Sequence, residues 1–390
     1  MDSSTPIRVV LWSPSGAGLH YHGPGQAMHR LYRSDGGKRF STSLVHGYVG
    51  QADVDGFNQI FNIGNFSPAL HRQLTYLWPS HRWIRRNARH YDVFHGANAY
   101  STTVQAAVWA EQSGLPSFVR VTAYESDLAS LSRLSRLLGM ARRRRSKVSR
   151  LSGVIAISRA IEQELLRYGI PEGKIFYLPN AVDCVRFAPA KSVAEKEDLR
   201  RKLGFGTEPI VAFCGGLVRR KRPHLVIEAL THPQLRAAGV RAVFFGAESD
   251  PSYYVALQRR AAELGVSESI RFLGHRDDVE QCLRAADLFV LPSRNEGMSN
   301  ALIEAMASGL TPVVTPVSGT SDVVSHGENG WILRDDGSDL AEAIDFYIAD
   351  DAIRVRHGAA ARNVIESRLS TTLVLERYRT VFNSVLSGAR

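Results

Sequence analysis

The sequence predicts an α/β protein in which helices cover both faces of parallel β-sheets. Short runs of β-branched and aromatic residues alternate with helical patterns almost throughout the chain. These runs lack apolar/polar alternation, as expected for strands buried on both faces of a parallel sheet. The repeated strand-helix order is typical of a doubly wound sheet. Because 390 residues, 44% of them hydrophobic, exceed one ordinary core, we expect two such domains.

The predicted strands are bounded by Gly, Pro, Ser or Asn, which favour turns. They comprise residues 7–12, 93–95, 117–121, 153–157, 210–214, 242–245, 270–273, 288–291 and 311–314. Helical patterns between the strands include residues 159–168, 225–230 and 301–307.

A polar, charged stretch at residues 189–202 divides this series into two. The first half ends near the sequence YLPNAV, and the second opens with IVAFCGG. We therefore place a first domain at residues 1–182 and a second at 183–371. A final amphipathic helix, within residues 372–390, has no strand after it and is free to pack back on the first domain.

Composition and charge narrow the class of protein. Three widely spaced cysteines without a C-x-x-C pair suggest neither a disulfide framework nor a zinc site. We find no signal-peptide pattern and no apolar run of about 18 residues, so we expect a cytoplasmic protein without a membrane span.

The positive charge is concentrated in the first part of the chain. Residues 1–150 contain 19 Lys and Arg against 8 Asp and Glu, and residues 151–390 contain 29 against 30. This asymmetry suggests an anionic partner such as a membrane surface, a phosphorylated acceptor or nucleic acid, or else a merely solubilising basic face. Residues 128–150 form a leucine-arginine pattern suited to an anionic membrane, with ordinary packing of the leucines as the alternative. The arginine run at 142–147 lacks interleaved aromatics, so we expect no nucleic acid.

Two glycine loops directly follow predicted strands, where phosphates approach helix N-termini in α/β sheets. The first, SPSGAGLHYHGPGQ, contains Gly16 but lacks the G-x-G-x-x-G spacing of a dinucleotide site. In the second, FCGGLVRRKRP, Gly215 and Gly216 precede four consecutive cations, Arg219 to Arg222, which suit a diphosphate. A solvated basic face is the alternative for that run.

The stretch SRNEGMSNALIEAMA follows the predicted strand at 288–291. Ser299 can cap a helix whose first backbone N–H groups are free to bind phosphate or hydroxyl oxygens. Glu296 lies in the loop, and Glu304 lies about two turns into the helix. Carboxylates accept hydrogen bonds from paired hydroxyls, so a sugar and a ribose are natural ligands, whereas two solvated glutamates on a surface helix are the alternative.

Residues 292–333 strongly resemble the retaining glycosyltransferases of family 4, whose donor signature is Glu-x7-Glu in a GT-B fold. The segments at 153–183, 215–223 and 271–293 agree in order. The resemblance covers nearly all of residues 150–335, while residues 1–150 match only in general layout. It implies two Rossmann-like, doubly wound domains facing a cleft, no metal and no other cofactor.

The resemblance also implies roles for individual residues. Glu304 would bind the ribose, Glu296 the donor sugar, and Lys221 the diphosphate. His95 would face the cleft as a catalytic group. The donor sugar and phosphates would contact the backbone of Gly297, Met298, Ser299 and Asn300.

Two departures from the family pattern concern the phosphates and the acceptor. Gly216 stands where the family usually has an arginine, so that contact is missing or is supplied by Arg219 or Arg220. Tyr124 replaces a family histidine on the acceptor side. His20 and His22 are further candidates for acceptor contact, with a plain loop role as the alternative. Asp53 and Asp55 form a D-x-D pattern, but we do not expect metal binding there.

The sequence thus predicts a retaining glycosyltransferase that uses a nucleotide diphosphate sugar, UDP- or GDP-linked, and a glycan, lipid-linked or small-molecule acceptor. An epimerase of the same fold acting on the sugar nucleotide is the alternative enzyme. A peripheral position on an anionic membrane is the alternative location.

Overall fold

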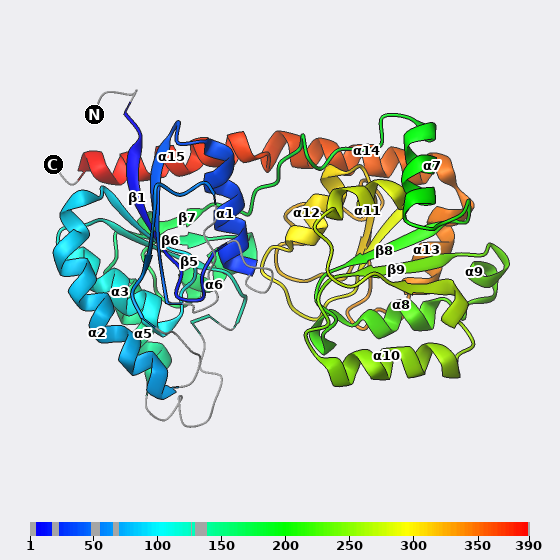
Figure 1. Ribbon diagram of the computed structural model, residues 1–390, viewed down its shortest axis with the longest axis horizontal. Coiled ribbons are helices and arrows are strands. Elements are labelled where there is room, and N and C mark those ends of the chain that lie inside the picture. Colours follow the sequence, from blue (N-terminus) through cyan, green and yellow to red (C-terminus); the bar gives the residue numbers. More distant parts are fainter. Residues whose placement is uncertain are drawn as a thin grey trace. The chain divides into compact units, whose positions relative to one another are not determined.

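The computed structural model of the chain describes residues 5–17, 23–47, 55–64, 70–125, 127–128 and 139–388. The chain divides into two compact units (Figure 1). Unit 1 comprises Met1–Ala181 together with Thr371–Arg390, and unit 2 comprises Val182–Ser370. Unit 1 is therefore built from two separate parts of the sequence, whereas unit 2 is continuous.

The described part of unit 1 contains a seven-stranded sheet whose pairings are all parallel. The strand order is β3-β2-β1-β4-β5-β6-β7. The strands are β1 Ile7–Trp12, β2 Phe40–His46, β3 Gln59–Asn62, β4 Val93–Gly96, β5 Ser117–Val121, β6 Gly153–Ala156 and β7 Ile175–Tyr177. The order reverses between β1 and β4, so their carboxyl ends border the place where ligands bind in open α/β sheets.

The helices of unit 1 come from both parts of the sequence. They are α1 Gly23–Asp35, α2 Leu70–Asn87, α3 Ser101–Gln112, α5 Met140–Val148, α6 Arg159–Arg167 and α15 Thr371–Gly388, with the 3-10 helices η1 Ala88–His90 and η2 Glu172–Lys174. Helix α3 packs against both α2 and α5, while α15 packs against α1. Helix α15 contributes Val374, Leu375, Tyr378 and Phe382 to the core of unit 1.

In unit 2, the described residues form a six-stranded parallel sheet in the order β10-β9-β8-β11-β12-β13. The strands are β8 Ile210–Cys214, β9 Arg241–Phe245, β10 Ile270–Phe272, β11 Leu288–Leu291, β12 Thr311–Val314 and β13 Trp331–Ile332. The helices are α7 Val193–Lys202, α8 Pro223–Ala229, α9 Pro233–Ala237, α10 Pro251–Glu263, α11 Val279–Ala285, α12 Asn300–Ala307, α13 Leu340–Ala349 and α14 Asp351–Arg368, with η3 Arg219–Lys221 and η4 Ser267–Ser269. Here the order reverses between β8 and β11.

All nine predicted strands are present, and each of their ends lies within one residue of the expected position. Four further strands, β2, β3, β7 and β13, were not predicted. Strand β2, FSTSLVH, is buried but carries Ser, Thr and His, so it lacks a continuous apolar run. Strands β3, β7 and β13 are short and lie at the edges of their sheets. Their sequences therefore contain only a weak strand signal.

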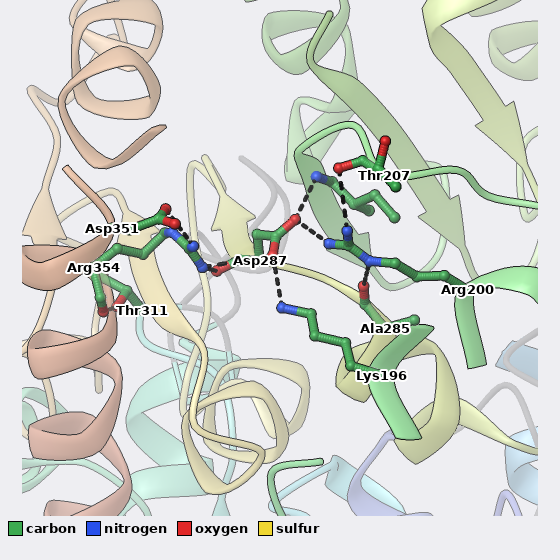
Figure 2. Close-up of polar contacts among 9 residues, drawn as sticks. Lys196, Arg200, Thr207, Ala285, Asp287, Thr311, Asp351 and Arg354 are labelled. Carbon is green, nitrogen blue, oxygen red and sulfur yellow. Dashed lines mark hydrogen bonds and ion pairs between the residues drawn. The ribbon is translucent and has the colours of Figure 1, made fainter. Parts of the chain in front are cut away.

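A carboxylate cluster ties helices to the amino end of the unit 2 sheet (Figure 2). Asp287, directly before β11, accepts a hydrogen bond from the Ile210 backbone at 2.8 Å. It also pairs with Lys196 at 2.6 Å and with Arg200, both from α7, and lies 3.6 Å from Arg354 of α14. Burial alone would raise the pKa of Asp287, but the lysine and arginine charges outweigh it and hold that pKa below its ordinary value. We assign this cluster a structural role, because it lies at the amino ends of the strands, and ligands bind at their carboxyl ends.

Candidate functional site

The candidate site lies at the carboxyl ends of β8 and β11, where the strand order of unit 2 reverses. Two loops meet there, residues 215–222 after β8 and residues 292–299 after β11. The Arg294 backbone N–H donates to the Arg220 carbonyl at 2.8 Å and so joins the loops. This is the position at which open α/β sheets bind their ligands.

Glu296 occupies the junction of the two loops. Its Oε1 lies 2.8 Å from Lys221 Nζ and 3.0 Å from Arg220 Nη1, and it accepts a hydrogen bond from the Ser293 hydroxyl at 3.1 Å. Burial would raise the pKa of Glu296, but Lys221 and Arg220 more than offset it, so the pKa is lowered. The site therefore holds an ionised carboxylate next to two cations.

Glycines let neighbouring segments approach each of the two loops closely. A Cβ on Gly215, whose φ is +137°, would lie 3.0 Å from the Lys221 side chain. A Cβ on Gly246 would lie 2.2 Å from the Gly215 carbonyl oxygen, and one on Gly319 would lie 2.2 Å from that of Gly297. Side chains at Gly246 and Gly319 would therefore push both site loops out of place.

Gly216 stands where the family usually has an arginine, and a side chain at this position would crowd Ser249. A Cβ on Gly216 would lie 3.0 Å from the Ser249 hydroxyl. The Arg219 guanidinium sits over the Tyr253 ring, 4.8 Å from its centre, while Arg220 reaches Glu296. Of the two substitutes suggested by the sequence, Arg220 is thus the one beside the predicted donor carboxylate.

Arg222 differs from the three cations before it. Its side chain is buried, and it donates to the carbonyls of Pro292 at 2.5 Å, Ser293 at 3.4 Å and Asp336 at 3.1 Å. The expectation that all four cations of this loop suit a diphosphate is therefore wrong for Arg222, because its guanidinium already binds backbone carbonyls.

Helix α12 begins as the sequence predicts. The Ser299 side chain accepts a hydrogen bond from the Leu302 backbone at 3.4 Å and caps the helix. Glu304 is only 4% exposed on α12, so it is not the solvated surface glutamate of the alternative interpretation. Met298 and Ser299, directly before α12, are also buried, and Asn300 is the first residue of α12. The ligand roles of these residues remain predictions.

The structure corrects the expectation that His95 faces a cleft as a catalytic group. His95, on β4 of unit 1, is fully buried, and its Nδ1 lies 2.6 Å from the Tyr32 hydroxyl. Its ring lies 5.4 Å from that of Tyr378 and 5.7 Å from that of Phe382, both from α15. Burial, together with the charge of Arg120, places the pKa of His95 well below its ordinary value. The side chain thus points into the core and stays neutral there.

The other unit 1 candidates are described only in part. Gly16 has a φ of +84°, and its carbonyl accepts a hydrogen bond from the Ser13 hydroxyl at 2.5 Å. The Tyr124 hydroxyl accepts a hydrogen bond from Arg167 at 3.1 Å. His20, His22 and Asp53 lie outside the described residues.

Asp55, the second aspartate of the D-x-D pattern, pairs with Arg33 at 2.8 Å. In the part of the chain that the structure describes, no three His, Cys, Asp or Glu side chains gather in a way that could hold a metal ion. None of the described helices combines the length and apolar character needed to cross a membrane.

Sequence reasoning missed three residues that shape these regions. Ser293 was quoted only as part of a motif, although its hydroxyl binds Glu296. The sequence pattern does not distinguish Arg222 from the three cations before it, although its side chain is buried. Arg120 is fully buried on β5 and donates to the Asn180 side chain at 2.6 Å. A lone arginine inside the apolar run SFVRV was the available signal for this last residue.

Comparison with known proteins identifies the family. Residues 8–186 match Glycosyltransferase Family 4, and residues 195–364 match Glycosyl transferases group 1. Together these matches span both units, and the chain belongs to the family 4 glycosyltransferases. The fold is GT-B, with two Rossmann-like domains.

Individual relatives agree with this assignment. The lipopolysaccharide core biosynthesis glycosyltransferase LpsE of Rhizobium meliloti is 32% identical over 171 residues, which cover 44% of this chain and 48% of the relative. The GDP-mannose-dependent monoacylated alpha-(1-6)-phosphatidylinositol monomannoside mannosyltransferase of Corynebacterium glutamicum is 32% identical over 219 residues, 53% of this chain and 56% of the relative. The chain thus spans about half the length of these curated relatives.

Among solved structures, Anabaena HepE in complex with UDP-glucose is similar, with a TM-score of 0.79 and 20% identity. The match covers 97% of this chain and all of HepE. At this level of identity, the likeness supports the fold.

Proposed function

We propose that the protein is a retaining glycosyltransferase that transfers a sugar from a UDP- or GDP-sugar to an acceptor. The observation that carries this proposal is the contact of Glu296 with Lys221 and Arg220 at the reversal of strand order. It puts cations for a diphosphate beside a carboxylate for sugar hydroxyls. The names of two similar proteins, one bound to UDP-glucose and one GDP-mannose-dependent, support this class of donor.

In the proposed reaction, the residues act mainly through electrostatics. Lys221 and Arg220 stabilise the negative charge that develops on the leaving diphosphate, assisted by backbone N–H groups of Gly216 and of the loop at Gly297. Glu296 orients the donor sugar, and Glu304 binds the ribose hydroxyls. The leaving phosphate takes the acceptor's proton, so the reaction needs neither a protein nucleophile nor a metal or other cofactor.

A donor panel tests the proposal. Purified protein is incubated with UDP- and GDP-sugars, with and without candidate acceptors, and release of nucleoside diphosphate is measured. We expect one donor to be cleaved well above the others, with a product of unchanged anomeric configuration by NMR. Absence of both cleavage and nucleoside diphosphate binding would overturn the proposal. Conversion of a donor into a different free sugar nucleotide would indicate the epimerase, which the comparisons do not favour.

We also propose that unit 1 reaches a lipid-linked acceptor by binding an anionic membrane surface peripherally. Helices α2, α3 and α5 contain a single acidic residue, Glu111. Its carboxylate accepts hydrogen bonds from the Ser117 backbone at 3.0 Å and from the Ser152 hydroxyl at 2.7 Å. Among the side chains of these helices whose burial is described, the exposed Lys and Arg residues are Arg82, Arg85, Arg86, Arg142, Arg143 and Lys147. Trp78 on α2, 66% exposed, adds an aromatic side chain suited to the headgroup region.

The arginine run of α5 is only partly available for this contact. Arg144 donates to the Asp127 carbonyl, and Arg145 donates to that of Leu128 at 3.3 Å and stacks on the Tyr168 ring. Arg142 and Arg143 are exposed. Lipid contact is therefore assigned to these two residues and to the arginines of α2, and not to the whole run.

Vesicle co-sedimentation tests the membrane proposal. Each basic residue near an anionic surface contributes about 1 kcal/mol, so changing Arg142 and Arg143 to Ser should weaken binding roughly 30-fold at low salt. Changing two exposed arginines of unit 2, Arg259 and Arg356, to Ser is the matched control and should have little effect. Wild-type protein that stays in the supernatant at low salt would favour a soluble glycan or small-molecule acceptor.

A further inference from the structure

We infer that Arg222 is a positioning residue that holds the loop carrying Glu296 in place. This inference rests on the proposed function, because it assigns Arg222 to the same site. Arg222 itself would not contact the ligand. It acts through the backbone of Pro292 and Ser293.

The guanidinium of Arg222 joins three segments of unit 2. Its Nε donates to the Pro292 carbonyl at 2.5 Å, and Nη2 donates to that of Ser293 at 3.4 Å. Its Nη1 donates to the Asp336 carbonyl at 3.1 Å, in the turn between β13 and α13. That turn packs closely on α8, since a Cβ on Gly337 would lie 2.9 Å from Leu225. The loop after β11 is thus fastened to a closely packed support.

The backbone at Arg222 is strained, which argues that the side chain has a specific role there. Its φ is +51°, a left-handed conformation that glycine adopts readily and that non-glycine residues rarely adopt. The next residue, Pro223, disfavours the right-handed helical conformation at position 222. Glycine would relieve the strain, but it would leave the carbonyls of the loop without their donor. The Arg222 guanidinium therefore supplies the hydrogen-bond donors to the loop carbonyls that a glycine would lack.

A continuous series of contacts leads from Arg222 to Glu296. The Ser293 carbonyl is held from two sides, by Arg222 and by the Thr315 hydroxyl at 2.5 Å. The hydroxyl of the same Ser293 donates to Glu296 Oε1 at 3.1 Å. Fixing the backbone of Ser293 therefore fixes the hydrogen bond that orients the carboxylate between its two cations. Loss of the Arg222 contacts should loosen Glu296 without removing any predicted ligand contact.

Two substitutions separate the functions of the side chain. Arg222→Lys keeps the charge but loses the fork, and Arg222→Gly removes the strain together with the donors. The matched control is Arg362→Lys, because Arg362 on α14 also donates to three carbonyls of unit 2, those of Cys184, Phe187 and Ala307. All three variants lose comparable backbone contacts, but only the first two lose them at the candidate site.

The first measurement is hydrogen exchange of the ligand-free protein, which does not depend on activity. We expect amide exchange in residues 293–299 to rise at least fivefold in both Arg222 variants and to stay unchanged in Arg362→Lys. The second measurement is steady-state kinetics with the best donor. There we expect kcat to fall about 10- to 50-fold in the Arg222 variants, while the Kd for nucleoside diphosphate changes less than threefold.

The outcomes distinguish this inference from the proposed function. Unchanged exchange in residues 293–299 overturns the positioning role, whatever the activity. Equal losses of kcat in Arg222→Lys and Arg362→Lys also overturn it, because they would reflect general stability. Raised exchange in the Arg222 variants, combined with a wild type that cleaves no sugar nucleotide, supports the positioning role and overturns the glycosyltransferase proposal alone.

Discussion

Strands β1 and β4 of unit 1 hold the same positions in their sheet as β8 and β11 hold in unit 2. In unit 1, β4 turns His95 inward against Tyr32 and the aromatic side chains of α15. In unit 2, the loop after β11 holds Glu296 between Lys221 and Arg220. The same position in the two sheets therefore has different roles. In unit 1 it carries a neutral histidine in the core, and in unit 2 it is followed by an ionic cluster. Topology marks where a site can form, and the direction and surroundings of the side chains decide whether it does.

The largest effect should come from the ionic cluster. Lys221→Met keeps the length of the side chain but removes the cation beside Glu296, so we expect kcat/KM to fall about 100- to 1000-fold, as for loss of one preorganised donor to a developing charge. Steady-state kinetics with the donor found in the panel measures this. Lys202→Met, at an exposed position on α7, is the control. A loss below fivefold would place the diphosphate elsewhere.

Glu304 should affect binding of the nucleotide itself. Because a carboxylate that accepts hydrogen bonds from two ribose hydroxyls makes charge-assisted contacts, Glu304→Ala should weaken nucleoside diphosphate binding by about 1.5 to 3 kcal/mol. Calorimetry on this variant and on Glu263→Ala, an exposed glutamate of α10, provides the comparison. Equal affinities of the two variants would remove Glu304 from the site.

His95 should have the opposite profile, with an effect on stability and little on turnover. His95→Leu leaves the buried Tyr32 hydroxyl without its partner, so we expect the free energy of unfolding to fall by about 1 to 3 kcal/mol. We expect kcat to stay within twofold of the wild type. Urea unfolding and kinetics measure the two quantities, with exposed His90→Leu as the control. A folded variant with a 100-fold loss of kcat would restore His95 to the catalytic group.

The smallest effect concerns pH. Since the pKa of His95 is lowered in the native state, the unfolded chain binds a proton below about pH 6.5 that native His95 does not bind. The stability that His95 contributes is therefore present above that pH and is lost as pH falls, by up to about 1.4 kcal/mol per pH unit. His95→Leu should flatten the dependence of unfolding free energy on pH between 6.5 and 5 by this amount. Parallel curves for the two proteins would mean that native His95 takes up its proton normally.

The sequence was sufficient for the central strands of both sheets because burial on both faces gives continuous apolar runs. Strands β1, β5, β8, β11 and β12 have the predicted bounds. The cap of α12 was also predicted, since a serine before an apolar helical pattern is a local signal. The signal was weak for β3 and β13, which at sheet edges pack less of their surface.

Side-chain direction could not be predicted from motif spacing alone. Glu296 lies in the loop after an apolar strand, whereas His95 lies within its strand, where successive side chains point to opposite faces. Arg222 belongs to a run of four cations, but its φ is positive before Pro223 and its guanidinium binds backbone carbonyls. The directions of the His95 and Arg222 side chains depend on backbone geometry, which cannot be predicted from the number of charges or glycines in a motif.

The contribution of α15 to unit 1 has a consequence for how the protein is made. Translation produces the seven strands of unit 1 first, but the helix that covers His95 and Phe118 follows only after all of unit 2. At about 5 to 20 residues per second, roughly 10 to 40 s pass between synthesis of the last strand of unit 1 and synthesis of Tyr378 and Phe382. Unit 2 can complete its own core on the ribosome in that interval. The nascent chain therefore exposes an apolar surface on unit 1 during that interval, and unit 1 completes its core only after α15 has been synthesised.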